Sequence, residues 1–212
     1  MCKECGCPGF ENDEGHWHDG HFHTHGDGTK PHSHEHGHDE DKPARILNIE
    51  KKILSHNDEI AARNRAWLAE RGVTAVNLIS APGSGKTLLL ERTLERLLGR
   101  IKCAVIAGDQ QTDNDARRLA GKGAEVRQIE TISACHLDAE RVGRLLPEII
   151  SKDTKLLFIE NVGNLVCPSA FDLGENFKIA LLSVTEGEDK PSKYPALFSL
   201  APVTILTKID LI

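Results

Sequence analysis

One segment constrains the fold of this chain more than any other: an apolar run, a glycine-rich loop and a helical pattern follow one another directly. Val76–Ser80 is typical of a short buried strand, and the loop Ser80–Thr87 (Ser-Ala-Pro-Gly-Ser-Gly-Lys-Thr) leads into apolar residues at helical spacing. This is the phosphate-loop pattern, with Ser80 in place of its first glycine. Gly83 and Gly85 let the backbone curl so that its amides face a phosphate, and the helix N-terminus adds a partial positive charge.

The loop residues therefore predict a nucleotide site. We expect Gly83, Ser84 and Gly85 to bind the phosphates through the backbone. Lys86 is expected to reach the β- and γ-phosphates, and Thr87 to place its hydroxyl on Mg²⁺.

Apolar runs and helical patterns alternate through the rest of the chain. The further expected strands are 103–107, 125–129, 155–159, 179–184 and 203–206, and the expected helices are 44–71, 87–98, 113–120 and 139–150, with Gly72 ending the first helix and Asp138 capping the last. This alternation predicts an α/β fold with a mostly parallel, doubly wound sheet over residues 44–212. Ligands of such sheets bind beyond the carboxyl ends of the strands.

Residues 1–43 form a different kind of segment, which we expect to be a disordered metal-binding tail because it has too few apolar residues to fold. Twelve of the 17 cysteines and histidines lie in the first 38 residues; they are Cys2, Cys5, Cys7, His16, His18, His21, His23, His25, His32, His34, His36 and His38. Three closely spaced thiolates favour an ion such as Ni²⁺, and the alternating histidines suggest a weak multi-site reservoir.

Charge and hydropathy exclude several classes of function. The net charge is −6, because the tail, with ten acidic residues against three lysines, carries −7 and the remainder carries about +1. The remainder has no basic stripe, so nucleic acid is not the expected partner. No apolar run approaches the roughly 20 residues that span a bilayer, and the N-terminus lacks a signal-peptide core. We expect a cytoplasmic protein with reduced thiols.

Acidic and glycine residues follow two of the expected strands. Asp109, in Gly-Asp-Gln-Gln-Thr, follows the second strand and is a candidate for holding Mg²⁺, as is Asp115 nearby. Glu160, in Glu-Asn-Val-Gly, is expected near the same metal, with the Gly163 amide near the γ-phosphate. We expect catalysis to rest on positioning by Lys86, Thr87, Asp109 and Glu160, with slow turnover because no arginine stands out as a finger.

Lys208 and Asp210 follow the last strand as Thr-Lys-Ile-Asp. Asp210 could accept two hydrogen bonds from guanine, which adenine cannot supply, so this motif favours GTP and GDP.

Cys135, His136 and Cys167 form a second candidate metal site, because both groups follow strands on the nucleotide side of the sheet. Two thiolates and one imidazole suit Zn²⁺ or Ni²⁺. Cys167 lies on the same loop as Gly163, so loss of a γ-phosphate could move a metal ligand.

Together these stretches resemble the hydrogenase nickel-incorporation GTPases (the HypB family), within the SIMIBI class of P-loop GTPases. The matching stretches are Cys2–Cys7, the His-rich leader, Ser80–Thr87, Gly108–Thr112, Ala134–Asp138, Glu160–Pro168 and Lys208–Asp210. In that family's pattern an asparagine stands at the position of Thr207. The pattern also continues past Asp210 with a further helix–strand–helix portion, so a chain ending at Ile212 is expected to be a fragment or a truncated variant.

The resemblance implies that Cys2, Cys5 and Cys7 form a tight nickel site and that the second site lies near a GTP-linked homodimer interface. It implies Mg²⁺-dependent GTP hydrolysis that regulates nickel delivery to the large subunit of a [NiFe]-hydrogenase, with a zinc-bearing accessory protein as partner. Lys190 and Lys193 would lie on a loop that approaches the nucleotide of the other protomer, or on an ordinary solvated loop.

The sequence leaves three alternative functions open. A nickel store with a vestigial nucleotide domain would bind several nickel ions and little GTP. A P-loop kinase would prefer ATP and transfer phosphate to an acceptor. A urease-type nickel GTPase is a close relative, although the Cys-x-x-Cys-Gly-Cys opening favours the hydrogenase branch.

Overall fold

A computed structural model of the chain describes residues 16–18, 21–23, 42–109, 118–119, 121–131 and 135–211. The chain divides into two units, Met1–Lys42 and Pro43–Ile212. In the first unit, β1 (His16–His18) pairs antiparallel with β2 (His21–His23). Most of the predicted tail, including Cys2, Cys5 and Cys7, lies outside the described residues, so its disorder and its metal site stay predictions.

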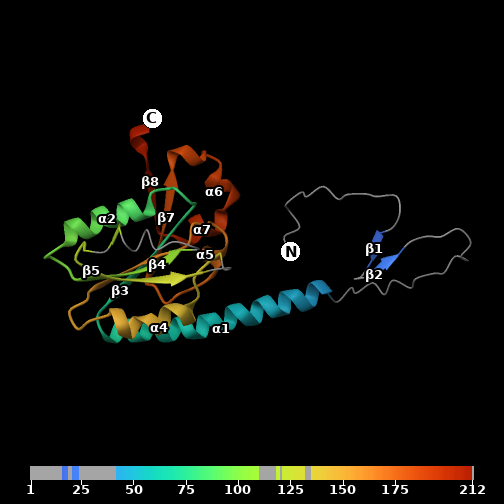
Figure 1. The fold of residues 1–212 in the computed structure, drawn as a ribbon, viewed down its shortest axis with the longest axis horizontal. Coiled ribbons are helices and arrows are strands. Elements are labelled where there is room, and N and C mark those ends of the chain that lie inside the picture. Colours follow the sequence, from blue (N-terminus) through green and yellow to red (C-terminus); the bar gives the residue numbers. More distant parts are fainter. Residues whose placement is uncertain are drawn as a thin grey trace, which may run out of the picture. The chain divides into compact units, whose positions relative to one another are not determined.

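The second unit is built on a six-stranded sheet (Figure 1). Its strands are β3 (Thr74–Ser80), β4 (Cys103–Asp109), β5 (Ala124–Glu130), β6 (Leu156–Glu160), β7 (Phe177–Ser183) and β8 (Val203–Thr207). The order across the sheet is β5-β4-β6-β3-β7-β8, and every neighbouring pair is parallel. The predicted parallel α/β fold is therefore confirmed, and the carboxyl ends of all six strands meet at one edge.

Helices cover both faces of this sheet, as a doubly wound fold requires (Figure 1). The helices are α1 (Lys42–Glu70), α2 (Lys86–Leu97), α4 (Ala139–Ile149), α5 (Cys167–Ala170), α6 (Lys190–Lys193) and α7 (Pro195–Leu200), with short 3₁₀ turns η1 (Val184–Glu186) and η2 (Ile209–Leu211). On one face Leu68 of α1 and Leu146 of α4 pack in one buried cluster, and on the other Leu90 and Leu94 of α2 pack in a second. Among the described residues, no helix is both long and apolar enough to cross a membrane.

The end of α1 illustrates how local sequence sets the element boundaries. Gly72 has a φ of 64°, and its amide donates to the carbonyl of Ala69, while the Val73 amide donates to the carbonyl of Leu68. This is the glycine-terminated Schellman arrangement, which satisfies the last free carbonyls of a helix. The chain then turns directly into β3, as the sequence predicted.

Short helices were missing from the sequence prediction. The helices α5, α6 and α7 have four to six residues each, and each carries a proline in its first turn. Such pieces are too short to display a hydrophobic period. The predicted helix 113–120 lies mainly outside the described residues; Arg118 and Leu119 are helical.

Candidate functional site

The phosphate loop joins the central strand β3 to the N-terminus of α2. Gly83 and Gly85 have φ values of 71° and 96°, which is the left-handed region that a side chain would strain. The loop and the first turn of α2 line a cavity of about 470 Å³, together with Gly108, Glu160, Asn161, Val162, Gly163 and Arg118. A cavity bounded by curled backbone and a helix N-terminus is suited to a phosphate chain.

Ser80 explains how the loop tolerates its departure from the usual glycine. The Lys86 ammonium, whose residue is only 8 % exposed, donates to Ser80 Oγ over 2.8 Å. Ser84 Oγ also donates to Ser80 Oγ. The Ser80 hydroxyl, which a glycine would lack, therefore orients the Lys86 side chain in the wall of the cavity.

Glu160 lies at the carboxyl end of β6 and faces the first turn of α2. The Thr87 hydroxyl donates to Glu160 Oε1 over 2.6 Å, and Glu160 is only 3 % exposed. Mg²⁺ prefers oxygen ligands, and at a phosphate loop it is commonly held by a hydroxyl and a carboxylate. The Thr87 hydroxyl and the Glu160 carboxylate therefore form a donor set that fits Mg²⁺. The structure thus brings together Thr87 and Glu160, which the sequence had assigned to the same ion.

Gly163 packs directly against the phosphate loop. A Cβ atom on Gly163 would lie 3.0 Å from the Cα of Pro82, which is closer than side chains normally approach a backbone. The segment that follows β6 therefore touches the loop through a position that only glycine fits without displacement.

Arg118 is a cavity residue that the sequence analysis missed. It lines the same cavity as Lys86 and Gly163, and its Nη2 lies 3.0 Å from Oε2 of Glu91 on α2. Hydrogen bonds from Lys122 and then Arg118 hold the pKa of Glu91 below its usual value. The only sequence signal was an Arg-Arg pair, which gives no indication of its neighbours in space.

The motif expected to read the base lies at the end of β8. The Thr207 hydroxyl donates to the backbone carbonyl of Ser84 over 2.7 Å, which ties this strand end to the phosphate loop. Lys208 has a φ of 56°, a left-handed conformation that is uncommon for a lysine and recurs at ligand-binding turns. Asp210 follows in η2 and is exposed.

The second metal cluster is assembled from two segments of the chain. The potential ligand atoms of Cys135, His136 and Cys167 all lie within 4.8 Å of one another, and each residue is partly buried. Asp138 caps α4 by accepting from the Arg141 amide at 2.8 Å, which fixes the chain just after His136. Two sulfurs and one nitrogen in this arrangement suit a tetrahedral or square-planar ion with a position left open.

The environment of the cluster affects its protonation. Burial lowers the pKa of His136, against the opposing effect of Asp138, so the neutral ligand form is favoured. Burial and the contact with Cys135 raise the pKa of the Cys167 thiol, so an ion that binds there must displace a proton. The His136 ring stacks on Phe171 at 3.8 Å between centroids, which orients the imidazole.

The other two predicted magnesium ligands, Asp109 and Asp115, stay predictions. Asp109 ends β4, but its side chain lies outside the described part of the structure, as does the whole of Asp115.

The fold and the loop geometry together define a P-loop nucleotide-binding domain. Residues 74–212 match the family described as "CobW/HypB/UreG, nucleotide-binding domain". The chain belongs to this family, within its HypB branch, as the resemblance of its motifs indicated.

Individual relatives also place the chain in the HypB branch of the family. The chain is 55 % identical over 168 residues to the hydrogenase maturation factor HypB of Rhizobium leguminosarum bv. viciae, covering 79 % of this chain and 56 % of that protein. It is 43 % identical to the crystal structure of HypB from Archaeoglobus fulgidus, with a TM-score of 0.70 over 74 % of this chain and 77 % of that one. The HypB structure from Helicobacter pylori in complex with nickel gives 43 % identity and a TM-score of 0.68 over 74 % of each chain. The chain thus spans about half the length of the first of these relatives.

Proposed function

We propose that this protein is a GTP-hydrolysing nickel metallochaperone that delivers nickel to the large subunit of a [NiFe]-hydrogenase during its maturation. One observation carries the proposal. Residues 160–167, here called the switch segment, begin at Glu160, which bonds to Thr87 of the phosphate loop, and end at Cys167, which groups with Cys135 and His136. A nucleotide site and a thiolate–imidazole cluster thus share one short piece of chain.

The nucleotide would be held by Gly83, Ser84 and Gly85 with Lys86, and its base by Lys208 and Asp210. Mg²⁺ would be held by Thr87 and Glu160, with Asp109 or Asp115 as further acids, and it supplies charge neutralisation on the phosphates when bound. Hydrolysis would be slow and would depend on positioning by these residues.

Nickel is the cargo in this proposal. Cys2, Cys5 and Cys7 would form the tight nickel site, and Cys135, His136 and Cys167 a second site for nickel or zinc. The nickel complex of the Helicobacter pylori relative supports nickel as a ligand of proteins of this family.

The partners are proposed from the family alone. They are a second protomer in a GTP-linked homodimer, a zinc-bearing accessory protein and the hydrogenase large-subunit precursor. Lys190 and Lys193 lie in α6, where Lys193 pairs with Asp189, so an approach to the other protomer's nucleotide would require this pair to open.

Metal titration in defined nucleotide states tests the proposal. Nickel and zinc binding would be measured for the wild type, a Cys2/Cys5/Cys7→Ala triple variant and Cys167→Ala, each with GDP and with a non-hydrolysable GTP analogue. We expect the triple variant to lose the tighter nickel site and to keep a weaker one whose affinity depends on the nucleotide. Cys167→Ala should lose that dependence. If several nickel ions bind per chain and GTP binds poorly, the protein is a nickel store.

A further inference from the structure

The switch segment also contacts the chain next to the metal cluster, at a residue other than Cys167. Asn161 follows Glu160 directly and is 1 % exposed. Its Oδ1 accepts from the amide of Leu137 at 3.3 Å and from the amide of Val162 at 3.0 Å, and its Nδ2 donates to Asn77 Oδ1 at 3.2 Å. Leu137 immediately follows His136, so one buried side chain joins the residue after Glu160 to the residue after a metal ligand.

A second asparagine of the switch segment holds the same stretch. Asn164 Nδ2 donates to the carbonyl of Cys135 at 3.5 Å, and its Oδ1 accepts from the Val166 amide at 2.9 Å. Asn164 therefore contacts the backbone between Cys135 and His136, and Asn161 contacts the backbone just after His136. A displacement of residues 160–164 has to move this pair or break these bonds.

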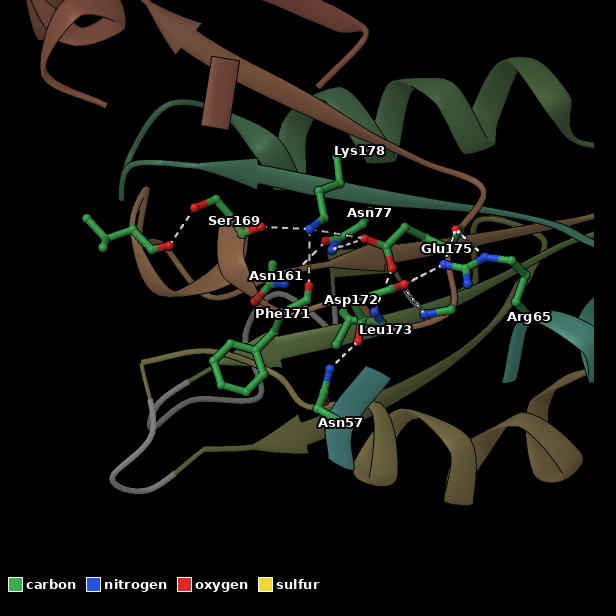
Figure 2. A network of polar contacts seen from close by, with 12 residues as sticks. Asn57, Arg65, Asn77, Asn161, Ser169, Phe171, Asp172, Leu173, Glu175 and Lys178 are labelled. Atoms are coloured by element: carbon green, nitrogen blue, oxygen red, sulfur yellow. Dashed lines mark hydrogen bonds and ion pairs between the residues drawn. The ribbon is translucent and has the colours of Figure 1, made fainter. Parts of the chain in front are cut away.

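Helix α1 also holds the two segments that follow the ligand residues of the cluster. Asn57 Oδ1 accepts from the Ala139 amide at 2.9 Å. Asn57 Nδ2 donates to the carbonyl of Asp172 at 2.7 Å (Figure 2). Asn64 Nδ2 donates to the carbonyls of Ala139 and Leu173 at 2.8 and 3.1 Å. Helix α1 thus holds both the start of α4 and the chain after α5. None of these four hydrogen bonds involves a residue that lines the phosphate cavity.

A buried polar chain extends from Asn77 to the other metal-ligand segment (Figure 2). Asn77 Nδ2 donates to Glu175 Oε1 at 3.2 Å, and Glu175 lies 3.7 Å from the Lys178 ammonium. Lys178 Nζ donates to the carbonyls of Ser169 at 2.8 Å and Phe171 at 3.2 Å, and the Phe171 ring stacks on His136. Asn161 is therefore the junction between the Cys135–His136 segment and the segment after Cys167.

We propose that Asn161 is the positioning residue through which the nucleotide state is transmitted to the Cys135–His136 half of the metal cluster. This inference rests on the proposed nucleotide-linked metal binding and adds the residue that carries it. When Thr87 and Glu160 rearrange around a nucleotide, the adjoining Asn161 shifts. Because the Leu137 amide is buried, losing its acceptor is costly, so the segment that bears His136 follows.

The test compares two buried asparagines that each accept a hydrogen bond from the chain close to the cluster. Ni²⁺ and Zn²⁺ affinities would be measured for wild type, Asn161→Leu and the matched control Asn57→Ala, each loaded with GDP or a non-hydrolysable GTP analogue. In wild type we expect the two nucleotide states to differ by a factor in the usual range of allosteric coupling, roughly 5- to 150-fold. Asn161→Leu should bring that ratio to within about twofold of one. Asn57→Ala should change both affinities by the same factor and preserve the ratio.

Two further measurements keep the inference testable if Asn161→Leu folds poorly. Asn164→Ala removes the neighbouring link at a less buried position and should reduce the ratio in part. In unmodified protein, hydrogen exchange at the Leu137 amide should differ between the GDP state and the GTP-analogue state.

The outcomes separate the two proposals. Equal metal affinity of wild type in both nucleotide states overturns the nucleotide-linked function and the role of Asn161 with it. A wild-type difference in metal affinity that survives undiminished in Asn161→Leu, or Leu137 amide exchange that is the same in the GDP and GTP-analogue states of the wild type, overturns the role of Asn161 alone.

Discussion

The Thr207 hydroxyl donates a 2.7 Å hydrogen bond to the backbone carbonyl of Ser84, a residue 123 positions earlier in the chain. The bond joins the carboxyl end of β8, where the base is expected to bind, to the loop expected to hold the phosphates. A nucleotide that occupies both places needs them at a fixed separation. We therefore expect Thr207 to fix the separation of the two places, a role that needs only one side-chain donor.

Removing this donor should weaken nucleotide binding without disturbing the strand. Thr207→Val keeps the shape of the side chain and loses one hydrogen bond to a carbonyl, which is worth about 1 kcal/mol or roughly a fivefold loss of GDP affinity. Titration with a fluorescent GDP analogue measures the loss. Thr204→Val, at an exposed position on the same strand, is the control and should bind GDP normally. Thr207→Asn restores a donor and should recover most of the affinity; wild-type affinity in Thr207→Val would show that the bond does not position the loop.

Sequence reasoning identified candidate site residues that lie close to one another along the chain. Gly83, Gly85 and Lys86 lie within a few residues of one another, and the motif itself requires a strand before and a helix after it. Thr87 and Glu160 were each expected near the same Mg²⁺, and the structure brings them into contact because the carboxyl ends of parallel strands meet at one edge of the sheet.

The residues that it missed depend on packing between distant elements. Asn57 bonds to Ala139 and Asp172, which are 82 and 115 residues away. No periodicity in α1 separates this asparagine from an ordinary polar residue of an amphipathic helix. Arg118 was missed for the same reason, because its place in the phosphate cavity depends on how Arg118 and Leu119 pack beside α2.

Arg118 should contribute to hydrolysis if the protein is a GTPase. It lines the phosphate cavity and is held by Glu91, so a nucleotide could compete for its guanidinium. Arg118→Ala should lower the single-turnover rate of GTP hydrolysis on the order of 100-fold, the usual effect of removing one donor to transition-state charge. GDP affinity should change little, because the contribution is made in the transition state.

Arg92→Ala is the matched control for this measurement. Arg92 lies on α2 and pairs with Glu95 at 2.9 Å, but it is not among the residues that line the cavity. Its removal should leave hydrolysis within about twofold of wild type, as expected for an exposed surface pair. Equal rates for Arg118→Ala and Arg92→Ala would exclude Arg118 from the reaction.

Gly163→Ala should distinguish the triphosphate from the diphosphate. The added methyl group would lie 3.0 Å from the Pro82 Cα, so residues 160–163 would be pushed away from the phosphate loop. We expect the GTP-analogue affinity to fall at least about tenfold, since a lost, well-placed contact costs 1–3 kcal/mol. GDP affinity, measured on the same sample, serves as the internal control and should fall much less. An equal loss for both nucleotides would indicate a general distortion of the loop.

Acid should remove the contribution to stability of the Arg65–Asp172 ion pair, which anchors α1 beside the metal cluster. Arg65 Nη2 lies 2.7 Å from Asp172 Oδ2, and the Asp172 carboxylate also accepts from the Gly174 amide at 2.8 Å. Burial alone would raise the pKa of Asp172, but these hydrogen bonds outweigh it and lower the pKa below its ordinary value. A depressed folded-state pKa gives stability that is fully present above the unfolded pKa and is lost as pH falls through the folded one.

Asp172→Asn should therefore be destabilising at neutral pH and progressively less so in acid. Both partners are more than a third exposed, so we expect a loss of about 1 kcal/mol in the free energy of unfolding at pH 7. The difference from wild type should shrink as pH falls below about 4, where the unfolded-state carboxyl protonates. Urea unfolding at pH 7, 5, 4 and 3 measures it, with the exposed Asp153→Asn as control. A difference that stays constant from pH 7 to pH 3 would mean that Asp172 acts through its shape and its neutral hydrogen bonds, and that its charge contributes nothing to holding α1.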